Sequence, residues 1–333
     1  MPGPMRSAIT GVTMFHPSRV VTNKDLEKLV DTSDEWIRTR TGISERRYVD
    51  EGQAASHLAV GAVEQLLRQT DTSPEEVELI VVGTVTPDML FPATACLIQQ
   101  QIGAKKAWGF DLSAACSGFV FSLATGDQFI RSGKHKKVIV VGVDIMTSIT
   151  NFEDRNTCVL FGDGAGAVML EPVSKTAELG ILDTVCHIDG TGAEFLYMPA
   201  GGSRRPPTAE TVEKKMHFVH QEGKQVFKFA VCEMANVTEE ILARNNFLPR
   251  DIDLFVAHQA NLRIIESCQK RLGLPDEKVV VTIDKYANTT SATIPTCLAT
   301  AVADGRLTKG KLVLITSFGA GFTWGAALVR WAY

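Results

Sequence analysis

The sequence predicts an α/β fold made of two related halves, and three observations predict it. Short β-branched apolar runs alternate with stretches of helix length, which is the pattern of sheets covered by helices. Two separated blocks of the chain match each other at one fixed offset, which indicates an internal duplication. The chain has 333 residues, 45% of them apolar and 22% charged, so it is long enough for one large core or two smaller ones.

The internal duplication relates segments that lie 175 residues apart (249 − 74). PEEVELIV begins at Pro74 and PRDIDLFV begins at Pro249, and the same offset relates residues 123–125 to 298–300. A glycine motif recurs as FGDG at Phe161 and FGAG at Phe318, an offset of only 157 (318 − 161), so the first copy carries additional residues. We therefore predict two pseudo-symmetric halves, residues 1–174 and 175–333, with sheets back to back and helices between and outside them.

Each expected element follows from its local pattern. Residues 54–69 and 117–132 have the length and composition of helices, and turn residues follow each. Residues 78–85 and 138–144 are near-continuous apolar runs, which are typical of strands buried on both faces. The other expected elements are a strand over 108–112, a buried strand that ends at His258, a helix over 291–304 and an exposed excursion over 201–215.

Charge and hydropathy exclude several classes of protein. The net charge is −4 and the isoelectric point about 6.0, so no global positive field exists to bind nucleic acid. The apolar runs are far too short to span a bilayer, and the opening MPGPMRSAIT has no apolar region of a secretion signal. The seven cysteines are scattered without a CxxC pair, so neither a zinc site nor a disulfide framework is supported. We expect a cytoplasmic protein with reduced thiols, no metal, no nucleic-acid partner and no membrane contact.

The sharpest signal for chemistry is DLSAACSGF, residues 111–119. It places Cys116 between a strand and the start of a helix, where unpaired N–H groups and the helix dipole favour a thiolate and can bind an oxyanion. Small residues on both sides leave room for a substrate to approach. The alternative is a buried structural cysteine, which is the more common fate of this residue. The motif alone leaves both interpretations open.

Two polar residues of the second half complete a candidate site. His258, in VAHQAN, ends a buried strand and precedes a helix, the usual place for site residues in α/β folds. Its equivalent in the repeat is Gly83, a residue with no side-chain chemistry. Asn288, in YANTTSA, is equivalent to Ser113, three residues before Cys116. The duplication therefore predicts that Cys116 and Asn288 lie on matching loops that face each other between the halves.

The glycine-rich segment SFGAGF, residues 317–322, closes the second half. It lacks the lysine of a GxxxxGK[ST] phosphate loop and the spacing of GxGxxG, so backbone donors for an oxyanion suit it better. The related FGDGAG at Phe161 is interpreted as tight strand–turn packing.

Together these motifs resemble β-ketoacyl-acyl-carrier-protein synthase III, a family of the thiolase-like superfamily. The resemblance runs from about residue 6 to 331 and is carried by DEWIRTRTGI (34–43), DLSAACSGF, NFEDRNTCVLFGDGAGA (151–167), HQANLRI (258–264), NTTSA (288–292) and SFGAGFTWGAALV (317–329). It implies the five-layered α-β-α-β-α thiolase fold, a homodimer, and condensation of an acyl-CoA starter with malonyl-acyl-carrier protein. It implies no cofactor, because acyl-CoA is a substrate.

The resemblance also implies roles for the catalytic residues. Cys116 resembles the nucleophile that accepts the acyl group, and His258 and Asn288 resemble the pair that binds the malonyl thioester carbonyl during decarboxylation. Loss of carbon dioxide leaves an enolate-like charge, which two fixed donors would stabilise. The backbone N–H groups of Cys116 and Ala320 resemble the oxyanion hole. The family usually has Gly at position 320, but only the N–H is needed.

The substrate-binding residues are carried over in the same way. Trp36 and Arg155 resemble the residues that sandwich the adenine ring of CoA, and Arg40 resembles the partner of its phosphates. Gly223 and Asn261 resemble pantetheine contacts. Phe91, in PDMLFPAT, resembles the loop residue that enters the acyl pocket of the partner subunit, and its bulk favours short starters such as acetyl-CoA or a small branched acyl-CoA. The basic residues that resemble the docking patch for acidic acyl-carrier protein are Lys228, Arg263, Lys270 and Arg271.

Several related functions make different demands on the sequence. A thiolase needs a second cysteine near the C-terminal glycine loop, and residues 317–324 have none. A hydroxymethylglutaryl-CoA-type synthase needs an acidic base beside the nucleophile, which the motif around Cys116 does not show. The stretch TSDEWIRTRTGI argues against a chalcone-type synthase. Two alternatives stay open: a starter-condensing enzyme of secondary metabolism, and a non-catalytic thiolase-fold acyl-binding partner.

Overall fold

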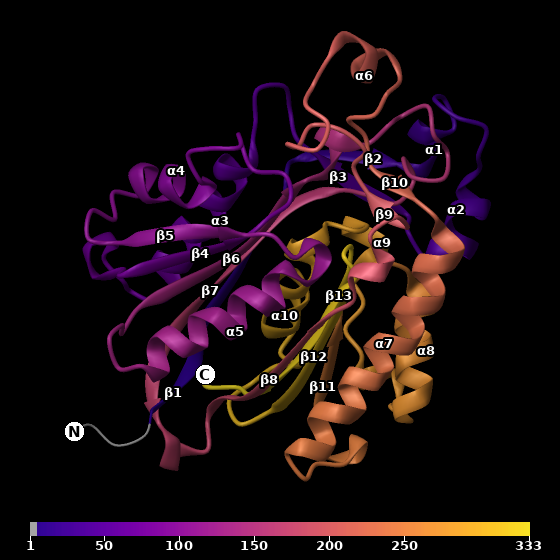
Figure 1. The fold of residues 1–333 in the computed structure, drawn as a ribbon. Coiled ribbons are helices and arrows are strands. Elements are labelled where there is room, and N and C mark those ends of the chain that lie inside the picture. Colours follow the sequence, from indigo (N-terminus) through magenta and orange to yellow (C-terminus); the bar gives the residue numbers. More distant parts are fainter. Residues whose placement is uncertain (1–4) are drawn as a thin grey trace.

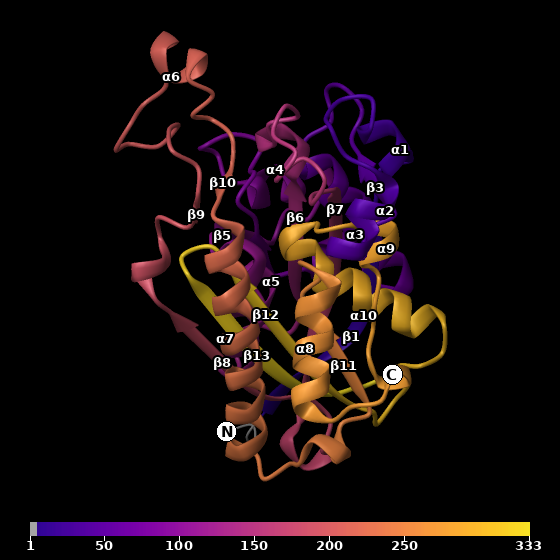
Figure 2. The same ribbon diagram turned by 90° about the vertical axis from the view of Figure 1, so that its right-hand side faces the viewer.

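The computed structural model describes residues 5–333 and shows two back-to-back sheets with helices between and outside them (Figure 1). The first sheet has the order β1-β7-β6-β4-β5 and the second the order β11-β12-β13-β8. Helices α5 (Gly118–Arg131) and α10 (Thr293–Ala303) lie between the sheets. Helices α3 (Ala55–Gln69) and α4 (Thr94–Gln101) cover the outer face of the first sheet, and α7 (Gly223–Arg244) and α8 (Leu262–Leu272) cover that of the second (Figure 2). The predicted five-layered α-β-α-β-α fold is confirmed.

The two sheets are built on the same plan. In the first, β4 pairs parallel with β5 and β6, whereas β7 pairs antiparallel with β6 and β1. In the second, β11 pairs parallel with β12, whereas β13 pairs antiparallel with β12 and β8. The strands of the first sheet are β1 (Met5–Phe15), β4 (Leu79–Gly83), β5 (Trp108–Leu112), β6 (Val138–Ile145) and β7 (Asp163–Ser174). Those of the second are β8 (Gly180–Ile188), β11 (Leu254–Ala257), β12 (Leu312–Gly319) and β13 (Thr323–Arg330).

The internal duplication is visible in these strands. Leu79 begins β4 and its equivalent Leu254 begins β11, and β6 and β12 likewise begin within one residue of equivalent positions. Every residue of β6 and β12 is buried, as expected for strands with helices on both faces. The strands of the first sheet all end by Ser174 and those of the second begin at Gly180. The division at 174/175 stays a prediction, since one hydrophobic cluster spans both sheets and joins residues such as Val138 and Val313.

A smaller lobe covers the upper ends of the sheets. Strands β2 (Arg19–Thr22) and β3 (Glu45–Tyr48) pair antiparallel, and helices α1 (Asn23–Leu26) and α2 (Asp34–Thr41) lie between them in the sequence. Helix α9 (Ile283–Tyr286) contacts β3. The fully buried guanidinium of Arg46 on β3 donates to the side-chain oxygen of Asn23 (2.8 Å) and to the carbonyl of Val159 (3.0 Å). These bonds join the lobe to the segment that precedes β7.

The expected excursion over 201–215 projects from the top of the molecule (Figure 1). It contains the short helix α6 (Ala209–Glu213), and the short antiparallel pair β9 (Leu196–Tyr197) and β10 (His220–Gln221) flanks it in the sequence. Most of its residues are exposed. The 3-10 helices of the described chain are η1 (Pro74–Glu76), η2 (Ala115–Ser117), η3 (Met146–Ile149), η4 (Lys175–Ala177), η5 (Gly190–Gly192), η6 (Pro249–Asp251), η7 (Asp276–Lys278) and η8 (Thr290–Ala292).

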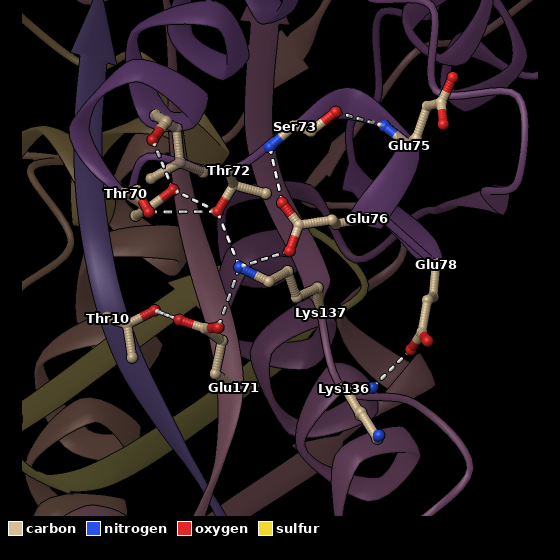
Figure 3. Close-up of polar contacts among 11 residues, drawn as sticks. Thr10, Thr70, Thr72, Ser73, Glu75, Glu76, Glu78, Lys136, Lys137 and Glu171 are labelled. Carbon is tan, nitrogen blue, oxygen red and sulfur yellow. Dashed lines mark hydrogen bonds and ion pairs between the residues drawn. The ribbon is translucent and has the colours of Figure 1, made fainter.

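A polar network fixes the lower end of the first sheet (Figure 3). The ammonium of Lys137, whose side chain is only 20% exposed, lies 2.9 Å from the hydroxyl of Thr72, 3.2 Å from Glu171 and 3.7 Å from Glu76. Glu171 on β7 also accepts a bond of 2.6 Å from the hydroxyl of Thr10 on β1. The cation therefore ties the start of β6 to β7, β1 and η1, and the network satisfies each partly buried charge.

Over residues 5–333, no helix combines the length and the apolar character needed to cross a membrane.

Candidate active site

Cys116 lies in a strained turn that residues of the second half of the chain hold by hydrogen bonds. The residue before it, Ala115, has φ +47°, a left-handed conformation that costs free energy for a residue with a Cβ. The hydroxyl of Ser317 donates to the carbonyl of Cys116 at 2.7 Å, and that of Thr323 donates to the carbonyl of Ala114 at 2.9 Å. A Cβ placed on Gly319 would lie only 2.7 Å from the backbone nitrogen of Cys116, so glycine is required for this approach. The predicted glycine loop therefore lies directly against the nucleophile candidate.

Burial favours the protonated form of the Cys116 thiol, against the thiolate that a helix N-terminus alone would favour. Cys116 is 7% exposed, and burial raises the pKa of its thiol to about 12, with the negative charge of Asp144 as a second cause. Helix α5 begins two residues later, at Gly118, and the backbone N–H of Cys116 itself lowers the pKa, but burial outweighs it.

This protonated resting state predicts an unusual pH dependence of alkylation. Only the thiolate reacts with iodoacetamide, so the rate at Cys116 should rise about tenfold per pH unit from pH 7 to pH 10 without a plateau. Peptide mass spectrometry of samples quenched over time, with exposed Cys232 followed in the same digest, measures the rate at each site. A plateau for Cys116 below pH 9 would contradict the protonated resting state.

His258 follows strand β11 and is almost completely buried. Burial lowers the pKa of its imidazole to about 3, so the ring is neutral. Its Nδ1 lies 2.7 Å from the hydroxyl of Thr293, which also reaches the carbonyl of Thr290 at 3.0 Å, while Nε2 has no partner among the described residues. Thr293 has one hydroxyl proton. Donated to the carbonyl of Thr290, it leaves the hydroxyl oxygen to accept from Nδ1–H, and Nε2 then carries no proton; turned toward Nδ1, it places the ring proton on Nε2, the form that donates to an oxyanion. A donor role for His258 thus depends on the orientation of this hydroxyl.

Asn288 lies between α9 and η8, in a turn as strained as that of Cys116. Ala287 has φ +57° and ψ −155°, and Thr290 has φ +49° although it is β-branched. The side-chain oxygen of Asn288 accepts a bond of 2.9 Å from the N–H of Thr290, so its amide N–H₂ is the end left to donate. The backbone of Asn288 bonds to Leu160 and Gly162, on either side of Phe161 in FGDG, at 3.0 and 3.1 Å. The first half thus holds the Asn288 loop as the second half holds Cys116.

Sequence reasoning missed a buried carboxylate beside these turns. Asp144, near the end of β6, is fully buried and accepts hydrogen bonds from the loop after β4 and from η8. Burial raises the pKa of its carboxyl group, and the hydrogen bonds it accepts oppose that shift. The signal that could have found it is an acidic residue at the end of the otherwise apolar run VIVVGVDI.

The residues matched to the CoA site lie together, but in a closed arrangement. The guanidinium of Arg155 lies 4.7 Å from the centre of the Trp36 ring and that of Arg40 lies 5.7 Å from it. Arg155 also pairs with Asp31 at 3.6 Å. Because Arg155 contacts Trp36 directly, no aromatic ring fits between them as the two residues stand. The expected sandwich therefore requires Arg155 to move.

The two residues matched to pantetheine differ in what they offer. Gly223 begins α7 at an exposed position with open space around its Cα. Asn261 caps α8: its side-chain oxygen accepts from the N–H of Arg263 at 2.9 Å, and its amide donates to the carbonyl of Arg40 at 2.9 Å. This side chain therefore joins α8 to α2, and its pantetheine contact stays a prediction.

The basic residues matched to carrier-protein docking lie on the adjoining helices α7 and α8. Lys228, Arg263 and Lys270 are exposed, and the Arg263 guanidinium lies over the ring of Phe227. Arg271 differs, because both ends of its guanidinium fork bond to Glu239, at 2.7 and 2.6 Å. Its charge is thus neutralised within the chain, which weakens its assignment to the docking patch.

The fold and site together define a class: a thiolase-fold condensing enzyme, with a thiol on one of two pseudo-symmetric turns and an imidazole and amide from the other half. Residues 110–190 match the family described as 3-oxoacyl-[acyl-carrier-protein (ACP)] synthase III, and residues 242–331 match its C-terminal family. The chain is 52% identical to the beta-ketoacyl-[acyl-carrier-protein] synthase III of Koribacter versatilis, over 98% of each chain, and 52% identical to that of Chlorobaculum tepidum, over 98% of this chain and 100% of the other. The chain belongs to the β-ketoacyl-[acyl-carrier-protein] synthase III family.

Solved structures support the same assignment. The 3-oxoacyl-[acyl-carrier-protein] synthase III of Aquifex aeolicus superimposes with a TM-score of 0.90 at 43% identity, over 98% of this chain and all of that one. The priming β-ketosynthase of the R1128 polyketide pathway superimposes with a TM-score of 0.91 at 34% identity, over 100% and 98%. Curated relatives that are about half identical over nearly their full length carry the name beta-ketoacyl-[acyl-carrier-protein] synthase III.

Proposed function

We propose that the chain condenses an acyl-CoA starter with malonyl-acyl-carrier protein to give a 3-oxoacyl-acyl-carrier protein, the reaction that begins fatty acid synthesis. The observation that carries the proposal is the pair of strained turns, one with Cys116 and one with Asn288, each hydrogen-bonded by the opposite half of the chain. Family membership supplies the reaction class. The two turns support the assignment of acyl transfer to Cys116 and of decarboxylation to Asn288 and His258.

In the first half-reaction, the sulfur of Cys116 bonds to the acyl carbon and the thioester bond to CoA breaks. The thiol proton leaves with the CoA sulfur, so no charge remains on the protein. Because burial keeps Cys116 protonated until substrate arrives, attack and proton loss are coupled. The negative oxygen of the tetrahedral intermediate is assigned to the backbone N–H groups of Cys116 and Ala320, which belong to segments in direct contact.

In the second half-reaction, the carbon–carbon bond to the malonyl carboxylate breaks and carbon dioxide leaves. The enolate oxygen that results is assigned to the amide of Asn288 and the Nε2–H of His258. The enolate carbon then bonds to the acyl carbon on Cys116 and the bond from that carbon to the Cys116 sulfur breaks; the thiolate released takes up one proton from water. A neutral His258 suits this role, because an uncharged ring can still donate from a protonated Nε2 and burial disfavours a charged imidazolium there.

Substrate entry is assigned to the surface between α2, α7 and α8. Trp36 and Arg155 would enclose the adenine ring once Arg155 swings away from Asp31, and Arg40 would meet the CoA phosphates. The helix faces with Lys228, Arg263 and Lys270 supply the positive charge that an acidic carrier protein would meet in a chain of net charge −4. Such exposed charges act mainly on the rate of association.

A homodimer is part of the proposal. Strand β5 is at the edge of the first sheet and pairs with β4 on one side only, which leaves backbone groups for another strand. Near this edge Leu90 and Phe91 are 84% and 83% exposed, far more than apolar side chains of this size usually are. A second copy paired along β5 would cover both residues and would place Phe91 in its partner's acyl pocket.

Starter choice offers the sharpest test of this proposal. We expect kcat/KM with malonyl-carrier protein to be highest for acetyl-CoA or isobutyryl-CoA and to fall for hexanoyl- and dodecanoyl-CoA, because Phe91 shortens the pocket. Replacement of Phe91 by Ala should raise the hexanoyl rate relative to acetyl by roughly 10-fold, the scale of a few methylene groups in an apolar pocket. Leu248→Ala, at another exposed apolar site, is the matched control. A tenfold preference of the unaltered protein for dodecanoyl-CoA would show the short-starter assignment to be wrong, and absence of any 3-oxoacyl product would refute the function itself.

A further inference from the structure

The two strained turns of the active site are equivalent in the duplication, yet each is held by a different residue. Ala115, with φ +47°, corresponds to Thr290, with φ +49°, and Cys116 corresponds to Ser291 (116 + 175). The strand residue packed against the Cys116 turn is Gly319, near the end of β12; counted along the equivalent strands β6 and β12, for which the offset of 175 holds, its position corresponds to Asp144 near the end of β6. The second half therefore uses a glycine for close backbone contact with its turn, where the first half places a carboxylate.

Asp144 bonds to two segments that flank the site. One carboxylate oxygen accepts from the N–H of Val85 at 2.8 Å and from the hydroxyls of Thr84 and Thr86 at 3.1 and 3.0 Å. The other oxygen accepts from the hydroxyl of Thr290 and from the hydroxyl and N–H of Ser291, the latter two at 2.9 and 3.3 Å. All these groups are buried or nearly so, which makes each bond costly to lose.

The bonds to η8 reach Asn288 through a single residue. Thr290 donates its hydroxyl to Asp144 and its backbone N–H to the side-chain oxygen of Asn288, at 2.9 Å. Its left-handed backbone is unfavourable for a β-branched residue, so the conformation persists only because such contacts hold it. If Thr290 relaxed toward an ordinary conformation, its N–H would turn and the Asn288 amide would lose its fixed orientation.

We propose that Asp144 is a positioning residue: through Thr290 it holds the amide of Asn288 in the orientation that decarboxylation needs. This role rests on the proposed function, because it concerns only the second half-reaction. Cys116 is held separately, by Ser317 and Gly319, so transfer of an acyl group from CoA does not require this contact.

The test uses a matched pair of variants at Thr290 and a third at Asp144. Thr290→Val keeps the shape and removes the hydroxyl donor, whereas Thr290→Ser keeps the donor; Asp144→Asn removes the charge. Three quantities are measured: the rate of Cys116 acylation by acyl-CoA from intact mass, and the kcat and KM for malonyl-carrier protein in the complete condensation.

For Thr290→Val and Asp144→Asn we expect kcat to fall by about 10- to 100-fold, the scale of a misplaced catalytic group. For Thr290→Val, acylation of Cys116 and the KM for malonyl-carrier protein should stay within about threefold, and Thr290→Ser should recover most of kcat. In Asp144→Asn, loss of the carboxylate charge also removes one cause of the raised pKa of the Cys116 thiol, so acylation there should not fall. An equal loss of acylation and condensation, or a Thr290→Ser variant no better than Thr290→Val, would overturn the positioning role. If Asp144→Asn does not fold, the Thr290 pair still decides the question. Failure of the unaltered protein to form product would instead count against the proposed function.

Discussion

Replacement of Cys116 by Ala is expected to abolish both the acyl-enzyme and the overall condensation. In the unaltered protein, acyl-CoA alone should add the mass of one acyl group to the peptide that contains Cys116. In Cys116→Ala this increment should disappear and kcat/KM should fall by at least about 10⁴-fold, as for other nucleophile deletions. Intact-protein mass spectrometry and a product assay measure the two effects.

The other cysteines provide the control for this experiment. Cys232 is exposed and outside the site, so Cys232→Ser should leave both the mass increment and the rate unchanged. Acyl labelling that persists in Cys116→Ala, on any other residue, would refute the assignment of the nucleophile.

Replacement of His258 or Asn288 by Ala should separate the two half-reactions. Each removes one donor from the enolate oxygen, so we expect condensation to fall by about 10²- to 10³-fold. Acylation of Cys116 should fall by less than about tenfold, because its oxyanion is assigned to backbone N–H groups that these substitutions leave in place. Quenched time courses with acyl-CoA alone give the rate of Cys116 acylation, and those with both substrates give the rate of condensation.

The comparison of the two rates is its own control, since a variant that merely unfolds loses both equally. An equal fall of acylation and condensation in both variants, with unchanged circular dichroism, would contradict the division of labour between the two halves.

Much of the fold could be predicted because duplication is a property of the sequence itself. The offset of 175 residues related β4 to β11 and β6 to β12 before any contact was known. It also placed Cys116 and Asn288 on matching turns, and the structure confirms that each turn is bonded by the opposite half. Sequence periodicity carries this information because it reflects which faces are buried.

The rest depends on side-chain geometry that no motif contains. The pKa of Cys116 is raised by the burial of its thiol, which opposes the effect expected of the helix N-terminus, and the sequence does not show how completely a side chain is buried. Asp144 escaped notice because its partners, Val85 and Ser291, lie 59 and 147 residues away. The contact of Arg155 with Trp36 likewise depends on the conformation of a long side chain, which no motif specifies.

The reciprocal hydrogen bonds between the two halves bear on how the molecule loses its structure. The Cys116 turn is held from the second half by Ser317 and Thr323, and the Asn288 loop is held from the first half by Leu160 and Gly162. Neither turn keeps its strained backbone if the opposite half melts, so partial unfolding of either half destroys the reactive geometry in both. Heat or denaturant should therefore inactivate the protein in one cooperative step, and a chain divided between the halves should regain its chemistry only when both pieces reassemble.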